Sequence, residues 1–209
     1  MVSAPIVLLS LAGALAGAAA WALVRARRIS IWTASATVNG ALALIALLTE
    51  RVRGSGDLGT WPAVLAGAGS GVVLYLATAG FMALGGRWPP LRRGAADVYG
   101  RRQGMSTPAV VAMAAGVVAP AEEVFWRGLV QGVLAAATDP LAGAVLGWVG
   151  YVAVNAVSGS VPIVLGAVVG GAAWAALAWG TGGVLASAAC HMVWTALMVL
   201  RPPLPREAT

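Results

Sequence analysis

The sequence predicts an all-α fold, a multi-pass transmembrane helical bundle with about seven spans. Of its 209 residues, 60% are hydrophobic and only 10% are charged, and the mean hydropathy is +0.87. These values lie far outside the range of soluble domains. The apolar residues also form runs close to the roughly 20 residues that a helix needs to cross a bilayer. The predicted spans are approximately 4–24, 30–49, 62–86, 108–136, 141–158, 161–180 and 182–200.

The spans use most of the chain, so no soluble domain of ordinary size remains. Residues 4–24 lack a basic segment before them and arginines follow them, so we expect an uncleaved first span and not a signal peptide. We divide the chain into three parts. Residues 1–107 hold the first helices and an interfacial loop, 108–200 form a core of four spans, and 201–209 form a tail.

The basic residues predict the topology. The net charge is +6, but all 13 basic residues are arginines and most lie in short loops between spans, a pattern that reports membrane orientation and contact with anionic lipid, not nucleic-acid binding. The even-numbered loops hold only Arg51 and Arg53. The odd-numbered loops and the tail hold ten: Arg25, Arg27, Arg28, Arg87, Arg92, Arg93, Arg101, Arg102, Arg201 and Arg206.

This bias places the N-terminus outside and the C-terminus in the cytoplasm, as an odd number of spans requires. The all-arginine basic set and the richness in Ala, Gly and Val are typical of a GC-rich bacterial genome. We therefore expect the bacterial plasma (inner) membrane.

Several local features are open to two interpretations. The longest loop, Arg87–Thr107, is either a short helix at the membrane interface or a solvated connector. Within the fourth span, Pro120 removes a backbone hydrogen bond, so we expect a kink there. Pairs of small residues four apart favour close helix packing over a dimer face. They are Gly13/Gly17, Gly67/Gly71 and Gly166/Gly170.

The stretch PAEEVFWRGLV, Pro120–Val130, places three charged residues inside an apolar run. Ionised side chains at mid-bilayer cost about 2.5–3.5 kcal/mol each, so these need partners or a purpose. Glu123 and Arg127 are four residues apart and share a helix face, so we expect them to pair. Glu122 is rotated by about 100° from Glu123. We therefore predict that Glu122 is the carboxylate free to act as a general base, unless all three form a purely structural ionic cluster.

The other intramembrane polar residues are few. His191 is the single histidine and lies near the middle of the last predicted span, with Thr195 one turn later. Asn155 lies in the fifth. Each has a plain structural explanation, as a hydrogen-bonded packing residue, although ionisable residues in a bilayer usually mark a functional interior. We expect Glu122 to come within about one water of Asn155 or His191.

Three motifs resemble those of the CPBP family, the CAAX prenyl protease 2 and bacteriocin-processing intramembrane proteases. EEVFWRG at Glu122–Gly128 resembles the family's EExxxR signature. Tyr151–Asn155 corresponds to the second motif, an aromatic residue followed four residues later by His, so Asn155 replaces a histidine. His191–Thr195 corresponds to the third motif, His followed four residues later by Asn or Asp, so Thr195 replaces that residue.

The resemblance implies an intramembrane endopeptidase of the glutamate type. Glu122 would be the base that activates water, Glu123 and Arg127 would shape the site, and His191 would donate to the oxyanion. Asn155 can hydrogen-bond a water but cannot take its proton, and Thr195 keeps one donor. The expected partners are a peptide or membrane-protein substrate and membrane lipids, without nucleic acid; the sequence leaves the oligomeric state open.

We expect no cofactor and no metal, because a catalytic zinc site needs three protein ligands and Glu123 is better used by Arg127. Two alternatives stay open. The first is a catalytically impaired pseudoprotease that acts as a membrane binding or scaffold protein, which Asn155 favours. The second is a small transporter that uses Glu122 and His191 as a relay, although the two related halves typical of transporters are not evident in the sequence.

Overall fold

A computed structural model describes residues 3–85, 88–102 and 104–203. Over this part the chain is helical, with no strand among the described residues, so the predicted all-α multi-pass bundle is confirmed. Arg87, Arg206 and the end of the predicted tail, 204–209, lie outside the described residues.

The elements follow one another in a simple order. The first half of the chain contains α1 (Ala4–Arg25), α2 (Ile31–Ala34), the π-helix η1 (Ser35–Asn39), α3 (Gly40–Leu48), α4 (Thr60–Gly85) and α5 (Pro89–Gly100). The second half contains α6 (Thr107–Met113), the π-helix η2 (Ala114–Val118), α7 (Ala119–Glu123), the π-helix η3 (Val124–Val130), α8 (Gln131–Ala137), α9 (Pro140–Ala156), α10 (Val161–Thr181) and α11 (Leu185–Leu200).

The continuous helical segments match the seven predicted runs. Five are long and apolar enough to cross a membrane: Ala4–Arg25, Ile31–Leu48, Thr60–Gly85, Thr107–Ala137 and Val161–Thr181. The other two, α9 and α11, have 17 and 16 residues. At 1.5 Å per residue they reach about 24–26 Å, slightly less than a hydrocarbon core of about 30 Å. Several apolar helices of this kind make the chain an integral membrane protein.

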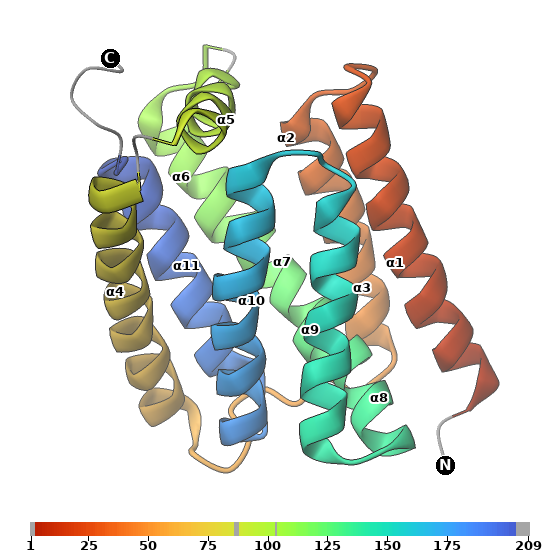
Figure 1. The fold of residues 1–209 in the computed structure, drawn as a ribbon. Coiled ribbons are helices and arrows are strands. Elements are labelled where there is room, and N and C mark those ends of the chain that lie inside the picture. Colours follow the sequence, from red (N-terminus) through yellow and green to blue (C-terminus); the bar gives the residue numbers. More distant parts are fainter. Residues whose placement is uncertain (1–2, 86–87, 103, 204–209) are drawn as a thin grey trace.

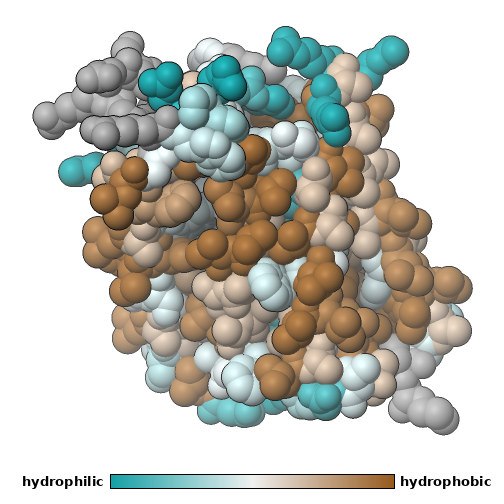
Figure 2. Space-filling model, in the orientation of Figure 1, coloured by the Kyte–Doolittle hydropathy of each residue, from teal (hydrophilic) through white to brown (hydrophobic). Residues whose placement is uncertain are grey.

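The long helices run in alternating directions through the bundle (Figure 1). The loop after α1, the helix α5 and the end of α11 therefore lie at one end, while the α3–α4 loop lies at the other. The first group is the one that carries most of the arginines. Figure 2 shows apolar side chains over the middle of one face and hydrophilic ones at its two ends.

The long loop after α4 contains a helix, as the first of its two interpretations expects, while its place at the membrane interface stays a prediction. Helix α5 buries Leu91 and Ala95 against the bundle and exposes Arg92 and Arg93. The Tyr99 hydroxyl donates to the Met198 carbonyl at the end of α11. An amphipathic helix of this kind is suited to the membrane interface.

Pro120 does not break the fourth long helix. It lies near the start of α7, between the π-helical segments η2 and η3. A π-helix shifts the backbone hydrogen bonds by one residue, which accommodates the N–H that proline lacks. We predicted a kink at Pro120. The irregular backbone of this helix consists of the π-helical segments η2 and η3, one on each side of Pro120 and Glu122.

Close backbone packing joins α4 to α11. A Cβ atom added at Gly67 would collide with the Ala186 carbonyl, and one added at Gly71 would lie 2.7 Å from the Cys190 carbonyl oxygen. This pair of glycines, four residues apart, therefore serves helix packing within one chain. It fixes the position of α11, and with it that of His191.

Candidate active site

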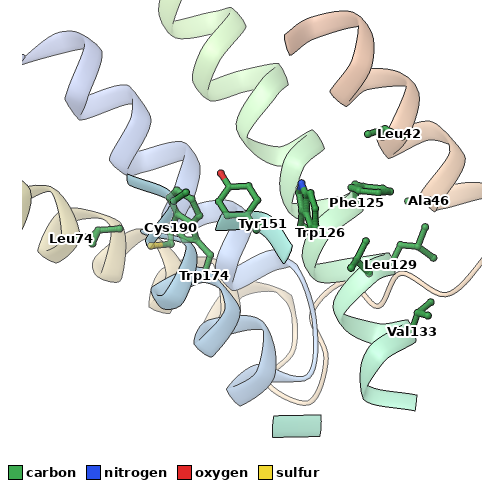
Figure 3. Close-up of a cluster of buried hydrophobic side chains, with 12 residues drawn as sticks. Leu42, Ala46, Leu74, Phe125, Trp126, Leu129, Val133, Tyr151, Trp174 and Cys190 are labelled. Atoms are coloured by element: carbon green, nitrogen blue, oxygen red, sulfur yellow. The ribbon is translucent and has the colours of Figure 1, made fainter. Parts of the chain in front are cut away.

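A row of aromatic rings lies at the centre of the bundle. Phe125 and Trp126 from η3, Tyr151 from α9 and Trp174 from α10 meet edge to face, with ring centroids 5.3–6.2 Å apart. Figure 3 shows Tyr151 between Trp126 and Trp174. These rings form a rigid apolar wall, and the polar residues of the site lie around it.

A small cavity of about 30 Å³ lies beside this wall. Helix α1, the segment from α2 to α3, the α7–η3 region and α9 all contribute to its lining. Its polar lining residues are Ser35, Asn39, Glu122, Tyr151 and Asn155, with Trp126 beside them. A cavity needs about 10–15 Å³ to hold a water molecule, so this one has room for a water within a polar lining.

Glu122 has two hydrogen-bond donors in this cavity. The Tyr151 hydroxyl donates to Glu122 Oε2 at 2.8 Å, and the Asn39 side-chain amide donates to Oε1 at 3.1 Å. Each carboxylate oxygen accepts one bond, an arrangement that fits the ionised form. No ion pair of Glu122 occurs among the described residues, so this carboxylate is held by neutral donors.

Glu123 and Arg127 form the predicted ion pair, with Arg127 Nη1 3.3 Å from Glu123 Oε1. Glu123 is fully buried and Arg127 is 5% exposed. Arg127 also donates through Nη2 to the Gly171 carbonyl at 3.0 Å, and its guanidinium lies 4.4 Å from the centre of the Tyr151 ring. The pair therefore ties the α7–η3 region to α9 and α10.

His191 lies with Glu123 and is not among the residues that line the cavity. Its Nδ1 is 2.9 Å from Glu123 Oε1, and its ring is stacked on Trp174 with centroids 3.6 Å apart. Of the two residues expected near Glu122, Asn155 lines the same cavity as Glu122, whereas His191 is not among its lining residues. His191 on α11 meets Trp174 of α10, whereas no residue of α10 or α11 lines the cavity.

Asn155 lines the cavity, but its side chain bonds its own helix. The amide nitrogen donates to the Tyr151 carbonyl at 2.9 Å. Thr195 is half-buried on α11, one turn beyond His191, and it does not line the cavity. Of the six residues named from the sequence, Glu122 and Asn155 thus meet at the cavity, while Glu123, Arg127 and His191 form a second polar group.

Two residues at the site escaped the sequence analysis. Tyr151 was noted only as the aromatic residue of a motif, although its hydroxyl contacts Glu122. Asn39 was overlooked inside the second apolar run. An asparagine within a predicted span is itself a signal, because a buried amide in lipid needs partners.

Within the described ranges, no three His, Cys, Asp or Glu side chains gather as a metal site would require. Glu123 and His191 lie together, and Cys190 is buried next to His191 in sequence.

Comparison with known families agrees with the motifs. Residues 105–197 match the family model described as type II CAAX prenyl endopeptidase Rce1-like. The match includes Glu122, Glu123, Arg127, Tyr151, Asn155 and His191, but not the cavity residues Ser35 and Asn39. It also covers the three motifs quoted above. No curated protein and no solved structure matches the chain. Residues 105–197, a little under half of the chain, are thus similar to the Rce1-like family of type II CAAX prenyl endopeptidases.

Proposed function

We propose that this protein is an intramembrane endopeptidase that uses Glu122 as its general base. The observation that carries the proposal is the Glu122 carboxylate beside a cavity with room for water, held by Tyr151 and Asn39. The family match adds that related proteins are peptidases. A positioned carboxylate and a water are the minimum that peptide hydrolysis of this type requires.

In the proposed reaction, Glu122 removes a proton from the cavity water as the water oxygen attacks the scissile carbonyl carbon. The carbonyl oxygen becomes an oxyanion in the tetrahedral intermediate. When the intermediate collapses, the C–N bond breaks and Glu122 returns the proton to the leaving amine nitrogen. The net reaction adds one water across one peptide bond.

We assign oxyanion stabilisation to His191, as the family resemblance implies. Its geometry adds a condition. Because Nδ1 faces the Glu123 carboxylate, Nδ1 carries the hydrogen, and Nε2 of the neutral ring would then have none. His191 can therefore donate from Nε2 only when both of its ring nitrogens carry a hydrogen. Glu123 and Arg127 are positioning residues in this scheme.

The proposed substrates are peptides that reach the site from the membrane, either near a C-terminus or in a membrane-proximal segment. The family description names CAAX prenyl endopeptidases, so prenylated CAAX peptides are the first class to test. We propose the bacterial plasma membrane as the location, with the N-terminus outside and the C-terminus in the cytoplasm. The arginine-rich loops at one end of the bundle support that orientation.

The second candidate is a pseudoprotease that binds a membrane peptide without cleaving it. Asn155 favours this function, because an amide cannot accept the proton that a histidine would take. A positioned acid–base group contributes about 10²–10⁴-fold to a rate, so the loss of a histidine is enough to silence a weak peptidase.

The test is cleavage by purified protein in liposomes. The substrates are prenylated CAAX peptides and unlipidated membrane-tethered peptides, and mass spectrometry of the products gives the cut position. Wild type is compared with Glu122→Gln, with Asn155→His and with the control Glu50→Gln, which removes an exposed loop carboxylate. We expect wild type and the control to cleave and Glu122→Gln to be at least about 100-fold slower.

The outcomes separate the two candidates. Cleavage by wild type that Glu122→Gln abolishes supports the peptidase. Silence in wild type with cleavage by Asn155→His identifies a pseudoprotease that retains the peptidase scaffold. Cleavage that persists in Glu122→Gln would overturn the assignment of the base.

A further inference from the structure

We propose that Asn39 and Tyr151 together position the Glu122 carboxylate, in a chain whose second motif has Asn155 where the family has a histidine. The N-terminal helices thereby complete a site whose other parts lie in the segment that matches the family. That role rests on the proposed peptidase activity, whereas the hydrogen-bonded group itself can be tested without it.

The contacts of Glu122 carry the inference. Its two carboxylate oxygens accept from two different helical segments, Oε2 from Tyr151 on α9 and Oε1 from Asn39 at the end of η1. Two donors on two oxygens fix both the position and the rotation of a carboxylate. A hydrogen bond to an ionised group also stabilises its charge, which a base embedded in an apolar bundle needs.

The other polar residues near the site are already engaged elsewhere. The Asn155 amide nitrogen donates to the Tyr151 carbonyl, and His191 Nδ1 is bonded to Glu123. Asn155 therefore acts on the backbone of the helix that carries Tyr151 and does not donate to Glu122. Asn155, which stands where the family has a histidine, therefore bonds the backbone of Tyr151, the residue that donates to Glu122. It does not itself act as a base.

π-Helical segments lie at one of the two contact points and on both sides of the other. Asn39 is the last residue of the π-helix η1, and α7, which carries Glu122, lies between the π-helices η2 and η3. π-Helical turns are rare and occur often at functional sites, because they re-aim a side chain without ending the helix. The three π-helical segments η1, η2 and η3 thus lie at or beside the contact between Asn39 and Glu122.

Asn39 also lies outside residues 105–197, so the family match does not include it. It lines the cavity from the segment between α2 and α3. The first helices of the chain are therefore more than a membrane anchor. A protein shortened to the matching segment would lose one of the two donors to its base.

The first experiment measures the reactivity of Glu122 directly. Dicyclohexylcarbodiimide adds to protonated carboxyl groups in membranes, and the labelled residue is identified by mass spectrometry of peptides, with Glu122→Gln as the assignment control. Wild type in liposomes is compared with Asn39→Leu and Tyr151→Phe, each of which removes one donor. We expect each variant to be labelled about tenfold faster, since a hydrogen bond to a charged group contributes about 1.5–3 kcal/mol.

Two further variants separate positioning from general loosening. Asn39→Gln keeps an amide donor and should label more slowly than Asn39→Leu. Thr37→Val alters an exposed residue of the same π-helix, whose hydroxyl bonds only its own helix, and should label like wild type. With a cleavable peptide, Asn39→Leu should lower kcat about tenfold and leave KM nearly unchanged.

The results distinguish this inference from the proposed function. Faster labelling in Asn39→Leu and Tyr151→Phe supports the two-donor arrangement, whether or not any peptide is cleaved. Wild-type labelling rates in both variants would overturn it, as would equal acceleration by Thr37→Val. If Asn39→Leu does not fold, the rates of Tyr151→Phe and Asn39→Gln decide the matter in the same way.

Discussion

Replacing Arg127 with methionine should destabilise the bundle by about 3 kcal/mol. Arg127 and Glu123 belong to one continuous helix, so much of their pairing survives when helices separate in a micelle. Unfolding breaks the contacts of Arg127 with other helices. These are its hydrogen bond to the Gly171 carbonyl and its cation–π contacts with the Tyr151 and Trp174 rings. A charged hydrogen bond contributes about 1.5–3 kcal/mol and cation–π contacts about 0.5–2 kcal/mol to the free energy of unfolding. The apolar packing of the methionine side chain offsets part of this loss.

The measurement is unfolding of the purified protein in mixed micelles as the fraction of a denaturing detergent rises, followed by tryptophan fluorescence. Arg53→Met is the matched control, because Arg53 pairs with Asp57 at the same spacing but the two side chains are 66% and 84% exposed. It should change the free energy of unfolding by no more than about 0.5 kcal/mol.

A double variant tests the cause. In Arg127→Met, the buried Glu123 carboxylate keeps only His191 as a partner. Adding Glu123→Gln removes that buried negative charge. The double variant should therefore be more stable than Arg127→Met. The reasoning is refuted if Arg127→Met costs less than about 1 kcal/mol, or if Glu123→Gln makes the variant still less stable.

Two further predictions concern the packing of the bundle and its interfacial helix. Gly71→Leu should destabilise the protein by about 2–3 kcal/mol, because the new side chain meets the Cys190 carbonyl. Gly69→Leu is the control and should cost little, because there is open space around Gly69. The same detergent titration compares the two variants. Burial raises the pKa of Tyr99 to about 12, so absorbance titration should show one tyrosine that ionises near that pH and is missing in Tyr99→Phe. Because the folded-state pKa exceeds the ordinary value of 10.0, Tyr99 should contribute stability below pH 10 that is lost as the pH rises toward 12, and Tyr99→Phe should lack that loss.

The sequence by itself was sufficient for features that depend on neighbours along one helix. Apolar runs of span length predicted the all-α membrane bundle, and the spacing of four between Glu123 and Arg127 predicted their ion pair. Both follow from the fixed rise and rotation of a helix. The EExxxR motif, being local as well, indicated the same family whose model residues 105–197 match.

Only the tertiary structure decided which residues meet across helices. It joined Glu122 to Asn39, 83 residues earlier, and it placed His191 on Glu123 instead of in the cavity with Glu122. Such contacts depend on the rotation of each helix about its own axis and on how closely neighbours approach. Those quantities are set by glycine contacts such as Gly71 against Cys190 and by π-helical turns, and a pattern of apolar residues does not encode them.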